Sequence, residues 1–402
     1  MRHQFKLKLT KLPYLALANI FRFLNSVDLF NLSIIDKRLM NAISLRHLGN
    51  AVCVITIRTT FRKEVSIQIT LNGSTLTWKF ARAHNQRMAI DGPIGPLTLG
   101  KTTLESCARH SVSNTVYTFG VSLDDDSFGS TITTVACYLF SLFSCSVQLE
   151  MDQNAYSKVP ELFKLSPVKK CVKLSLRADN NTTKEDVEGI LAKLGSLKSL
   201  DLGCYKGKSI DTGKIANLDS IRLNDAFWLP ANCLLQLNGR RIEVTENSFD
   251  AKVIRKMVDR WCRGEHEKLE VFTIYYSERN ELDLTVLLEE INMHAWSKQR
   301  RHRFYRINAT LACDCENGID FMRPDGKLAT FLFEKSKMHF LVWNERFPDF
   351  SLPAGQYFTQ VGIEEAFYEA AYPSPRVFLT NKDVVFDQQR RFEFSTDNEE
   401  II

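Results

Sequence analysis

The stretch from residue 12 to residue 43 is apolar at helical spacing and reads LPYLALANIFRFLNSVDLFNLSIIDKRLMNAI. Pro13 suits the start of a helix, and apolar residues recur at helical spacing after it. Asn25 or Ser26 ends this helix and caps a second one, and Asp36 caps a third. Three short helices in roughly 40 residues bury little apolar surface, and domains that small are marginal on their own. The stretch therefore predicts an apolar helical hairpin that docks on something else.

The same stretch carries a set of residues in a recognisable order. They are Leu12-Pro13, apolar positions through the first helix, Asp28-Leu29 and Lys37-Arg38. This order resembles the F-box, although many relatives carry Cys or Val where Ile35 stands and Trp where Met40 stands. The resemblance implies a three-helix F-box within residues 8–50 that binds a Skp-family adaptor and, through it, a cullin. The adaptor-binding residues that it implies are Leu12, Pro13, Leu17, Ile20, Phe21, Leu24 and Leu29.

Composition limits the other classes of function. Hydrophobic residues make up 44% of the 402 residues and charged ones 25%, which is typical of a soluble globular protein. The net charge of +5 is too mild to predict a nucleic-acid partner. The ten Cys are scattered without a C-x-x-C motif, as expected for thiols in a reducing compartment, and no cofactor is predicted. The apolar runs are too short for a signal peptide or a membrane span, so we expect a cytoplasmic or nuclear protein.

After residue 51 the pattern changes to β-structure. Alternating, β-branched segments predict strands, and Asn72-Gly73 predicts a tight hairpin turn. The segment GPIGPLTLG, residues 92–100, predicts a loop because it is rich in Gly and Pro. Residues 116–123 predict a further strand, residues 133–143 a buried helix, and residues 145–151 the strand that follows it.

A repeated unit then follows. Short strands align on one apolar position each, at steps of roughly 26, 21, 21 and 30 residues, close to the range of leucine-rich repeats. Helices are predicted between them at residues 185–194 and 251–261. The aligned positions are Leu174, Leu200, Ile221, Ile242 and Phe272. The pattern predicts parallel strands side by side, and hence a degenerate leucine-rich-repeat-like β/α domain within an α+β or α/β fold.

Residues 227–274 strengthen this assignment by resemblance. Their features are an Arg241-Ile242 pair ending a Leu-rich segment, a helix ending in Trp261, and a Lys-Leu-Glu that follows. They resemble the F-box-associated domain of type 2, which is typical of large, divergent nematode F-box families. Residues 319–333 resemble its last hairpin, with Asp-Gly at the turn. The predicted domains are the F-box (8–50), an F-box-associated recognition domain (51–344) and a partly disordered C-terminal extension (345–402), in which residues 364–371 predict a helix.

Possible chemical sites are weak. The acidic triplet at residues 124–126 lacks the spacing of a calcium loop. Cys313 and Cys315 lack a second pair for zinc, even with His302 or His339 nearby, and are expected on a strand. The basic run KQRRHRFYR, residues 298–306, is interpreted as a solvated loop that leads into a strand. No hydrolase, nucleotide-binding or metalloprotease motif occurs, so we expect a protein without catalytic activity.

The resemblance therefore predicts the substrate-recognition subunit of a Skp–cullin–F-box ubiquitin ligase. The alternative is a leucine-rich-repeat-like interaction module that acts outside any ligase. In either case an unknown protein substrate or ligand would contact exposed aromatic residues, because Trp and Tyr dominate interface hot spots. The candidates are Trp228, Tyr275, Tyr276 and Trp296.

Overall fold

The computed structural model describes residues 9–45, 51–58, 64–82, 93–99, 102–113, 116–123, 128–179, 181–203, 205, 207, 209–245, 247–276, 282–307, 312–334 and 336–347. It divides into two units, Met1–Leu237 and Asn238–Ile402. Both combine helices with a mostly β core, so the predicted mixed α/β class is confirmed. The leucine-rich-repeat-like assignment and the domain limits 8–50, 51–344 and 345–402 stay predictions.

The first unit begins with short helices whose caps were predicted. Asn25 accepts hydrogen bonds from the backbone N–H groups of Val27 and Asp28, at 3.0 and 2.9 Å. Asp36 caps the next helix in the same way through the N–H of Arg38. The elements are η1 (Leu9–Lys11), α1 (Tyr14–Phe21), α2 (Ser26–Ile35) and α3 (Lys37–Ser44).

A large sheet follows in the order β10-β9-β8-β7-β1-β2-β3-β6-β5-β4. The predicted turn joins β2 to β3, and Asn72 and Gly73 adopt the positive φ angles, 50° and 73°, of a tight hairpin turn. The strands that precede α4 are β1 (Ala51–Arg58), β2 (Glu64–Leu71), β3 (Ser74–Arg82), β4 (Pro93–Leu99), β5 (Thr102–Ser113) and β6 (Val116–Leu123).

The loop predicted at residues 92–100 is wrong, because Pro93–Leu99 forms strand β4. This strand ends the sheet order, and its pairing with β5 is irregular around Gly95. Proline lacks the N–H that a central strand would donate, so it is tolerated on a strand at the edge of a sheet or at a bulge. A composition typical of loops is therefore compatible with an edge strand.

The parallel part of this sheet has the predicted register. Leu174 lies opposite Leu200, which lies opposite Ile221. The helix predicted at residues 185–194 is α7, which buries Val187 and Ile190. The elements are α4 (Phe128–Leu142), β7 (Cys145–Asp152), α5 (Gln153–Lys158), η3 (Leu162–Lys164), α6 (Ser166–Lys169), β8 (Lys173–Arg177), α7 (Lys184–Lys193), β9 (Ser199–Gly203), η4 (Thr212–Lys214), β10 (Ser220–Leu223), η5 (Ala226–Trp228) and α8 (Ala231–Leu234).

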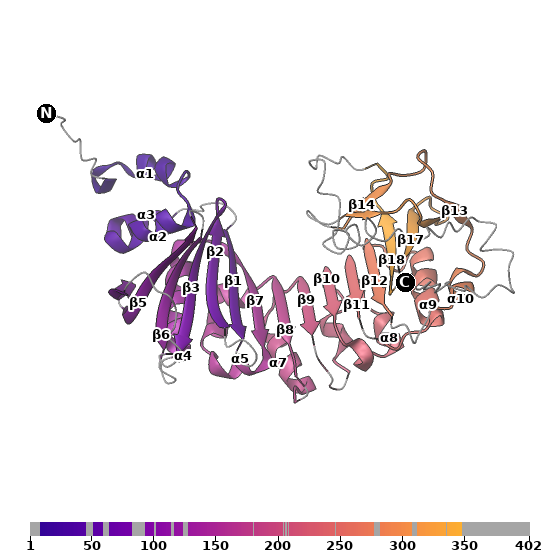
Figure 1. The fold of residues 1–402 in the computed structure, drawn as a ribbon, viewed down its shortest axis with the longest axis horizontal. Coiled ribbons are helices and arrows are strands. Elements are labelled where there is room, and N and C mark those ends of the chain that lie inside the picture. Colours follow the sequence, from indigo (N-terminus) through magenta and orange to yellow (C-terminus); the bar gives the residue numbers. More distant parts are fainter. Residues whose placement is uncertain are drawn as a thin grey trace, which may run out of the picture. The chain divides into compact units, whose positions relative to one another are not determined.

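Helix α2 joins the helical segment to the sheet, at the turn end of the β2–β3 hairpin (Figure 1). The Ser26 N–H donates to Ser74 Oγ at 3.0 Å, and the two hydroxyls lie 2.9 Å apart. Phe30 is fully buried and packs edge-on against Trp78 and Tyr138, with ring centroids 5.4 and 6.1 Å away. Such ring pairs add to the free energy of burial.

Two further hydrogen bonds tie this joint together. Ser33 Oγ lies 2.9 Å from the Tyr138 hydroxyl, and Asn72 Nδ2 donates to the Leu24 carbonyl at 3.1 Å. The joint therefore combines a buried aromatic cluster with a satisfied set of buried hydroxyls, which fixes its geometry as well as its stability.

The second unit contains the sheet β13-β16-β17-β18-β12-β11 and the small sheet β14-β15. Trp261 of α9 packs edge-on against Phe321 and Phe340. A separate core joins Val271, Leu341 and Trp343 to residues of the β14-β15 segment. The elements are β11 (Arg241–Val244), α9 (Ala251–Cys262), β12 (Val271–Tyr275), α10 (Leu284–Leu288), β13 (Met293–Ala295), β14 (Phe304–Arg306), β15 (Ala312–Asp314), β16 (Ile319–Met322), β17 (Leu328–Glu334) and β18 (Lys337–Trp343).

Sequence patterns anticipated several of these features. Ile242 of β11 pairs in parallel with Phe272 of β12, as the repeat alignment predicted. The β16–β17 hairpin turns at Asp325 and Gly326, and Gly326 has a φ of 87°, which favours glycine.

Removing the Phe30 ring tests the joint. We expect Phe30→Ala to lower the free energy of unfolding by about 3–5 kcal/mol, because it leaves a cavity between Trp78 and Tyr138. Phe23→Ala is the matched control, since the Phe23 side chain is 88% exposed. Urea unfolding followed by tryptophan fluorescence measures both. Similar stability losses for the two variants would contradict a buried aromatic joint.

Candidate docking surfaces

The structure places the seven predicted adaptor-binding residues in different environments. Leu17, Phe21 and Leu29 are at most 1% exposed. They belong to the protein's own interior, because α1 and α2 pack on α3 and α2 packs on β3. The half-buried members of the set are Leu12, Ile20 and Leu24, and the exposed one is Pro13.

A different set of apolar side chains faces solvent on the same helices. Of the eight large hydrophobic side chains that are exposed among the described residues, five belong to this helical segment. They are Tyr14 (43%), Leu15 (74%), Phe23 (88%), Ile35 (75%) and Leu45 (73%). We call these five residues the apolar helical surface. Burying a Leu, Ile or Phe side chain is worth about 1.5–3 kcal/mol, so each of these side chains can stabilise a complex that covers it.

Helical periodicity could not identify this surface. The pattern marks residues that share one face, such as Leu17, Phe21 and Leu24, and that face turned out to be mostly internal. Leu15 and Phe23 stand outside the pattern. Large apolar residues that lie off the periodic face are therefore the sequence signal that could have indicated the exposed side chains.

The four aromatic candidates are divided between the two units. Trp228 belongs to the first unit, and Tyr275, Tyr276 and Trp296 belong to the second. Each is half-buried. The Tyr276 hydroxyl donates to the Glu334 carbonyl at 2.8 Å.

Near Trp228 the exposed aromatic side chain is that of its neighbour. The Trp228 ring packs edge-on against buried Tyr205, with centroids 5.2 Å apart. Phe227 is 64% exposed and is the stronger candidate for contact with a ligand.

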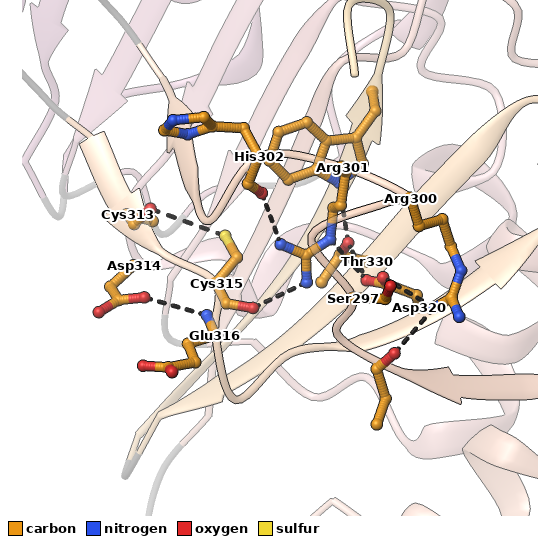
Figure 2. A network of polar contacts seen from close by, with 12 residues as sticks. Ser297, Arg300, Arg301, His302, Cys313, Asp314, Cys315, Glu316, Asp320 and Thr330 are labelled. Atoms are coloured by element: carbon orange, nitrogen blue, oxygen red, sulfur yellow. Dashed lines mark hydrogen bonds and ion pairs between the residues drawn. The ribbon is translucent and has the colours of Figure 1, made fainter. Parts of the chain in front are cut away.

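A buried polar network occupies the basic run of the second unit (Figure 2). Arg301 is fully buried and donates from Nε to Asp320 at 2.8 Å and from Nη2 to the Cys315 carbonyl at 2.7 Å. Asp320 also accepts from Thr330 Oγ1, which in turn accepts from Trp343 Nε1. The interpretation of this run as a solvated loop is thus wrong at Arg301. A buried guanidinium requires paired acceptors, and these bonds supply them.

Cys313 and Cys315 lie at the edge of this network (Figure 2). Cys313 belongs to β15, as predicted, whereas Cys315 follows the end of that strand, and both thiols are buried. Burial raises the pKa of Cys313 to about 12 and that of Cys315 well above its ordinary value. Both thiols are therefore protonated near neutral pH. Within the described ranges, no cluster of three His, Cys, Asp or Glu side chains is arranged to hold a metal ion.

One polar row resembles a catalytic arrangement. Thr273 Oγ1 lies 2.8 Å from His339 Nδ1, and His339 Nε2 lies 3.3 Å from Glu334 Oε1. Thr273 and His339 are each only 5% exposed. A substrate therefore has no access to this hydroxyl, and the row links strands β12, β18 and β17 within the sheet.

Two predictions concern residues that the structure does not describe. The acidic triplet at residues 124–126 and the helix predicted at residues 364–371 lie outside the described residues. In the part of the chain that the structure describes, no helix has the length and apolar character needed to cross a membrane.

Comparisons with known proteins give a match to a family model and matches to individual proteins. Residues 212–274 match a family model described as F-box associated. The chain is 23% identical over 349 residues to uncharacterized protein F59B2.8 of Caenorhabditis elegans, covering 85% of this chain and 78% of that protein. It is 22% identical over 350 residues to uncharacterized protein F59B2.9 of the same organism, covering 85% and 80%. No solved structure gives a match. The F-box-associated resemblance of residues 227–274 is thus confirmed, and the F-box resemblance of residues 8–50 stays a prediction.

The buried ion pair gives a stability prediction. We expect Arg301→Met to cost about 3 kcal/mol of unfolding free energy, because Asp320 would lose its fully buried cation and keep only the partly exposed Arg300, at 3.3 Å. Arg303→Met is the control, since the ion pair of Arg303 with Asp314 is 42% exposed on both sides, and it should cost less than about 1 kcal/mol. Chemical denaturation measures both, and equal losses would refute a special role for Arg301.

His266 gives a pH prediction. It is 2% exposed, and neither ring nitrogen has a hydrogen-bond partner. Burial, with Arg260 nearby, lowers its pKa below the ordinary 6.5. The unfolded chain then binds the proton more tightly, so the stabilising contribution is complete above pH 6.5 and is lost as the pH falls through the folded pKa. In that window we expect His266 to contribute a slope of up to about 1.4 kcal/mol per pH unit.

The variant His266→Phe isolates this contribution from that of other titrating groups. Urea unfolding of both proteins between pH 7.5 and pH 5 should show a shallower decline for the variant. Parallel declines would show that His266 is not the responsible group.

Proposed function

We propose that this chain is the substrate-recognition subunit of a Skp–cullin–F-box ubiquitin ligase, working in the cytoplasm or nucleus. Helices α1–α3 would bind the Skp-family adaptor and, through it, a cullin, while the sheets that follow would hold a protein substrate. The observation that carries the proposal is the concentration of exposed apolar side chains on the segment that resembles the F-box. The F-box-associated match of residues 212–274 supports the same assignment.

The proposal divides the work among the helical residues. The apolar helical surface would contact the adaptor, together with Pro13 and the half-buried Leu12, Ile20 and Leu24. Buried Leu17, Phe21 and Leu29 would act indirectly, because they hold the helices that present this surface. Amphipathic helices that bury apolar side chains on a partner are a common mode of recognition.

The chain itself would make and break no covalent bond. Its contribution would be proximity, since a substrate held beside a ubiquitin-conjugating enzyme reacts as if in the same molecule. The α2 joint supports this role, because its buried contacts to Ser74, Trp78 and Tyr138 transmit the orientation of the adaptor-binding helices to the sheet.

Adaptor binding tests the proposal. We expect Leu15→Asp with Ile35→Asp to reduce binding to a purified Skp adaptor at least about tenfold, because each places a charge in an apolar contact. Both side chains are about three-quarters exposed, so the melting temperature should stay close to that of the wild type. The matched control is Ser146→Asp with Asn154→Asp, which adds the same charge at exposed positions of the same unit.

Leu17→Ala separates contact from folding. It should lower the unfolding free energy by about 2–5 kcal/mol, and any loss of binding should follow the unfolded fraction. Equal adaptor binding by the Leu15/Ile35 variant and its control would contradict the proposed contact. An absence of adaptor binding by the wild type would favour an interaction module that acts outside a ligase.

A further inference from the structure

The parallel strands β7–β10 carry a second face besides the one that forms the core (Figure 1). Side chains alternate along these strands between buried apolar residues and polar residues that reach solvent to different degrees. We call the second face the open face. Its residues are Ser146, Gln148 and Glu150 of β7; Lys173, Ser175 and Arg177 of β8; Ser199, Asp201 and Gly203 of β9; and Ser220 and Arg222 of β10.

Neither cation of β8 has an exposed carboxylate as its partner in register. Lys173 is exposed, and its partners in register are Gln148 and Ser199, which are neutral. Arg177 is exposed as well. Its partner on one side is Gly203, which has no side chain.

The partner of Arg177 in register on β7 is Asp152, whose side chain is buried and caps a helix. Its carboxylate accepts the N–H of Ala155 at 3.0 Å and caps α5. The two cations of β8 are therefore available to an anion from outside the protein.

The carboxylates of the open face lie in the row between these cations, and protein donors hold them. Asp201 accepts from Asn224 Nδ2 at 3.0 Å and from Ser175 Oγ at 3.4 Å. Glu150 accepts from Thr56 Oγ1 at 3.5 Å. The acidic groups are thus half-buried and hydrogen-bonded, whereas the basic groups extend outward. The exposed charged side chains of the open face, those of Lys173, Arg177 and Arg222, are all basic.

We propose that the open face of β7–β10 binds an extended segment of a protein substrate that carries acidic or phosphorylated side chains. That the bound segment belongs to a substrate rests on the proposed function. That it carries negative charge rests on the geometry of the two β8 cations. Lys173 and Arg177 are four residues apart, which is about 13 Å along a strand. An extended peptide with anionic groups four residues apart places one beside each cation, and Arg is well suited to bind carboxylate or phosphate in a bidentate manner.

Fluorescence anisotropy of the full chain with labelled 12-residue peptides tests this. One peptide carries Glu at every fourth position, a second carries phosphoserine there, and a third carries Gln. We expect the two anionic peptides to bind at least about tenfold more tightly than the Gln peptide, and the preference to weaken as salt is raised. Comparison of the first two identifies the source of the negative charge.

A pair of charge-reversal variants locates the site. Lys173→Glu with Arg177→Glu should abolish the preference for anionic peptides. Lys158→Glu with Lys193→Glu is the matched control, because it makes the same charge change at exposed positions of α5 and α7. It should change the affinity less than about twofold.

Three results would overturn the proposal. They are equal binding of the Glu and Gln peptides, equal effects of the two variants, and tighter binding of a single-stranded RNA 12-mer at the same β8 cations. Adaptor binding is measured on the same variants. The Lys173/Arg177 variant should retain it, so failure of this inference is distinguishable from failure of the proposed function.

Discussion

The contact between α2 and the β2–β3 hairpin is the interaction on which the other parts depend. A three-helix segment of this size cannot build a sufficient core by itself. Phe30 solves this problem by entering the sheet's own core between Trp78 and Tyr138. The Ser26–Ser74 bonds then fix the angle of entry. Because one apolar face is used in this way, the remaining apolar residues of the helices stay outside, where a partner can cover them.

In the second unit, a buried polar network holds the basic run, residues 298–306, in place. The Arg301 guanidinium is buried on a network that joins Asp320, Thr330 and Trp343. Buried ion pairs add little net stability compared with apolar packing, but losing one partner is costly. The network therefore ties a strongly basic run to one position. Exposed cations also lie on the open face of the first unit, at Lys173 and Arg177.

Local signals were predictable from the sequence, and tertiary ones were not. The caps at Asn25 and Asp36 and the parallel register depend on neighbouring residues or on a repeated apolar position. The buried state of Leu17 and the exposure of Leu15 depend on which face of α1 packs on α3. Arg301 looked solvated because Asp320 lies 19 residues away in the chain. Periodicity and composition do not report such distant pairings.

Hydrogen–deuterium exchange of the full chain, with and without a purified Skp adaptor, tests whether helices α1–α3 form the adaptor-binding surface. We expect slower exchange of backbone amides across α1–α3 when the adaptor is bound, with little change in the β2–β3 hairpin, whose contacts to α2 already exist in the free protein. Complex formation without added protection in α1–α3, or no complex at all, would contradict this expectation.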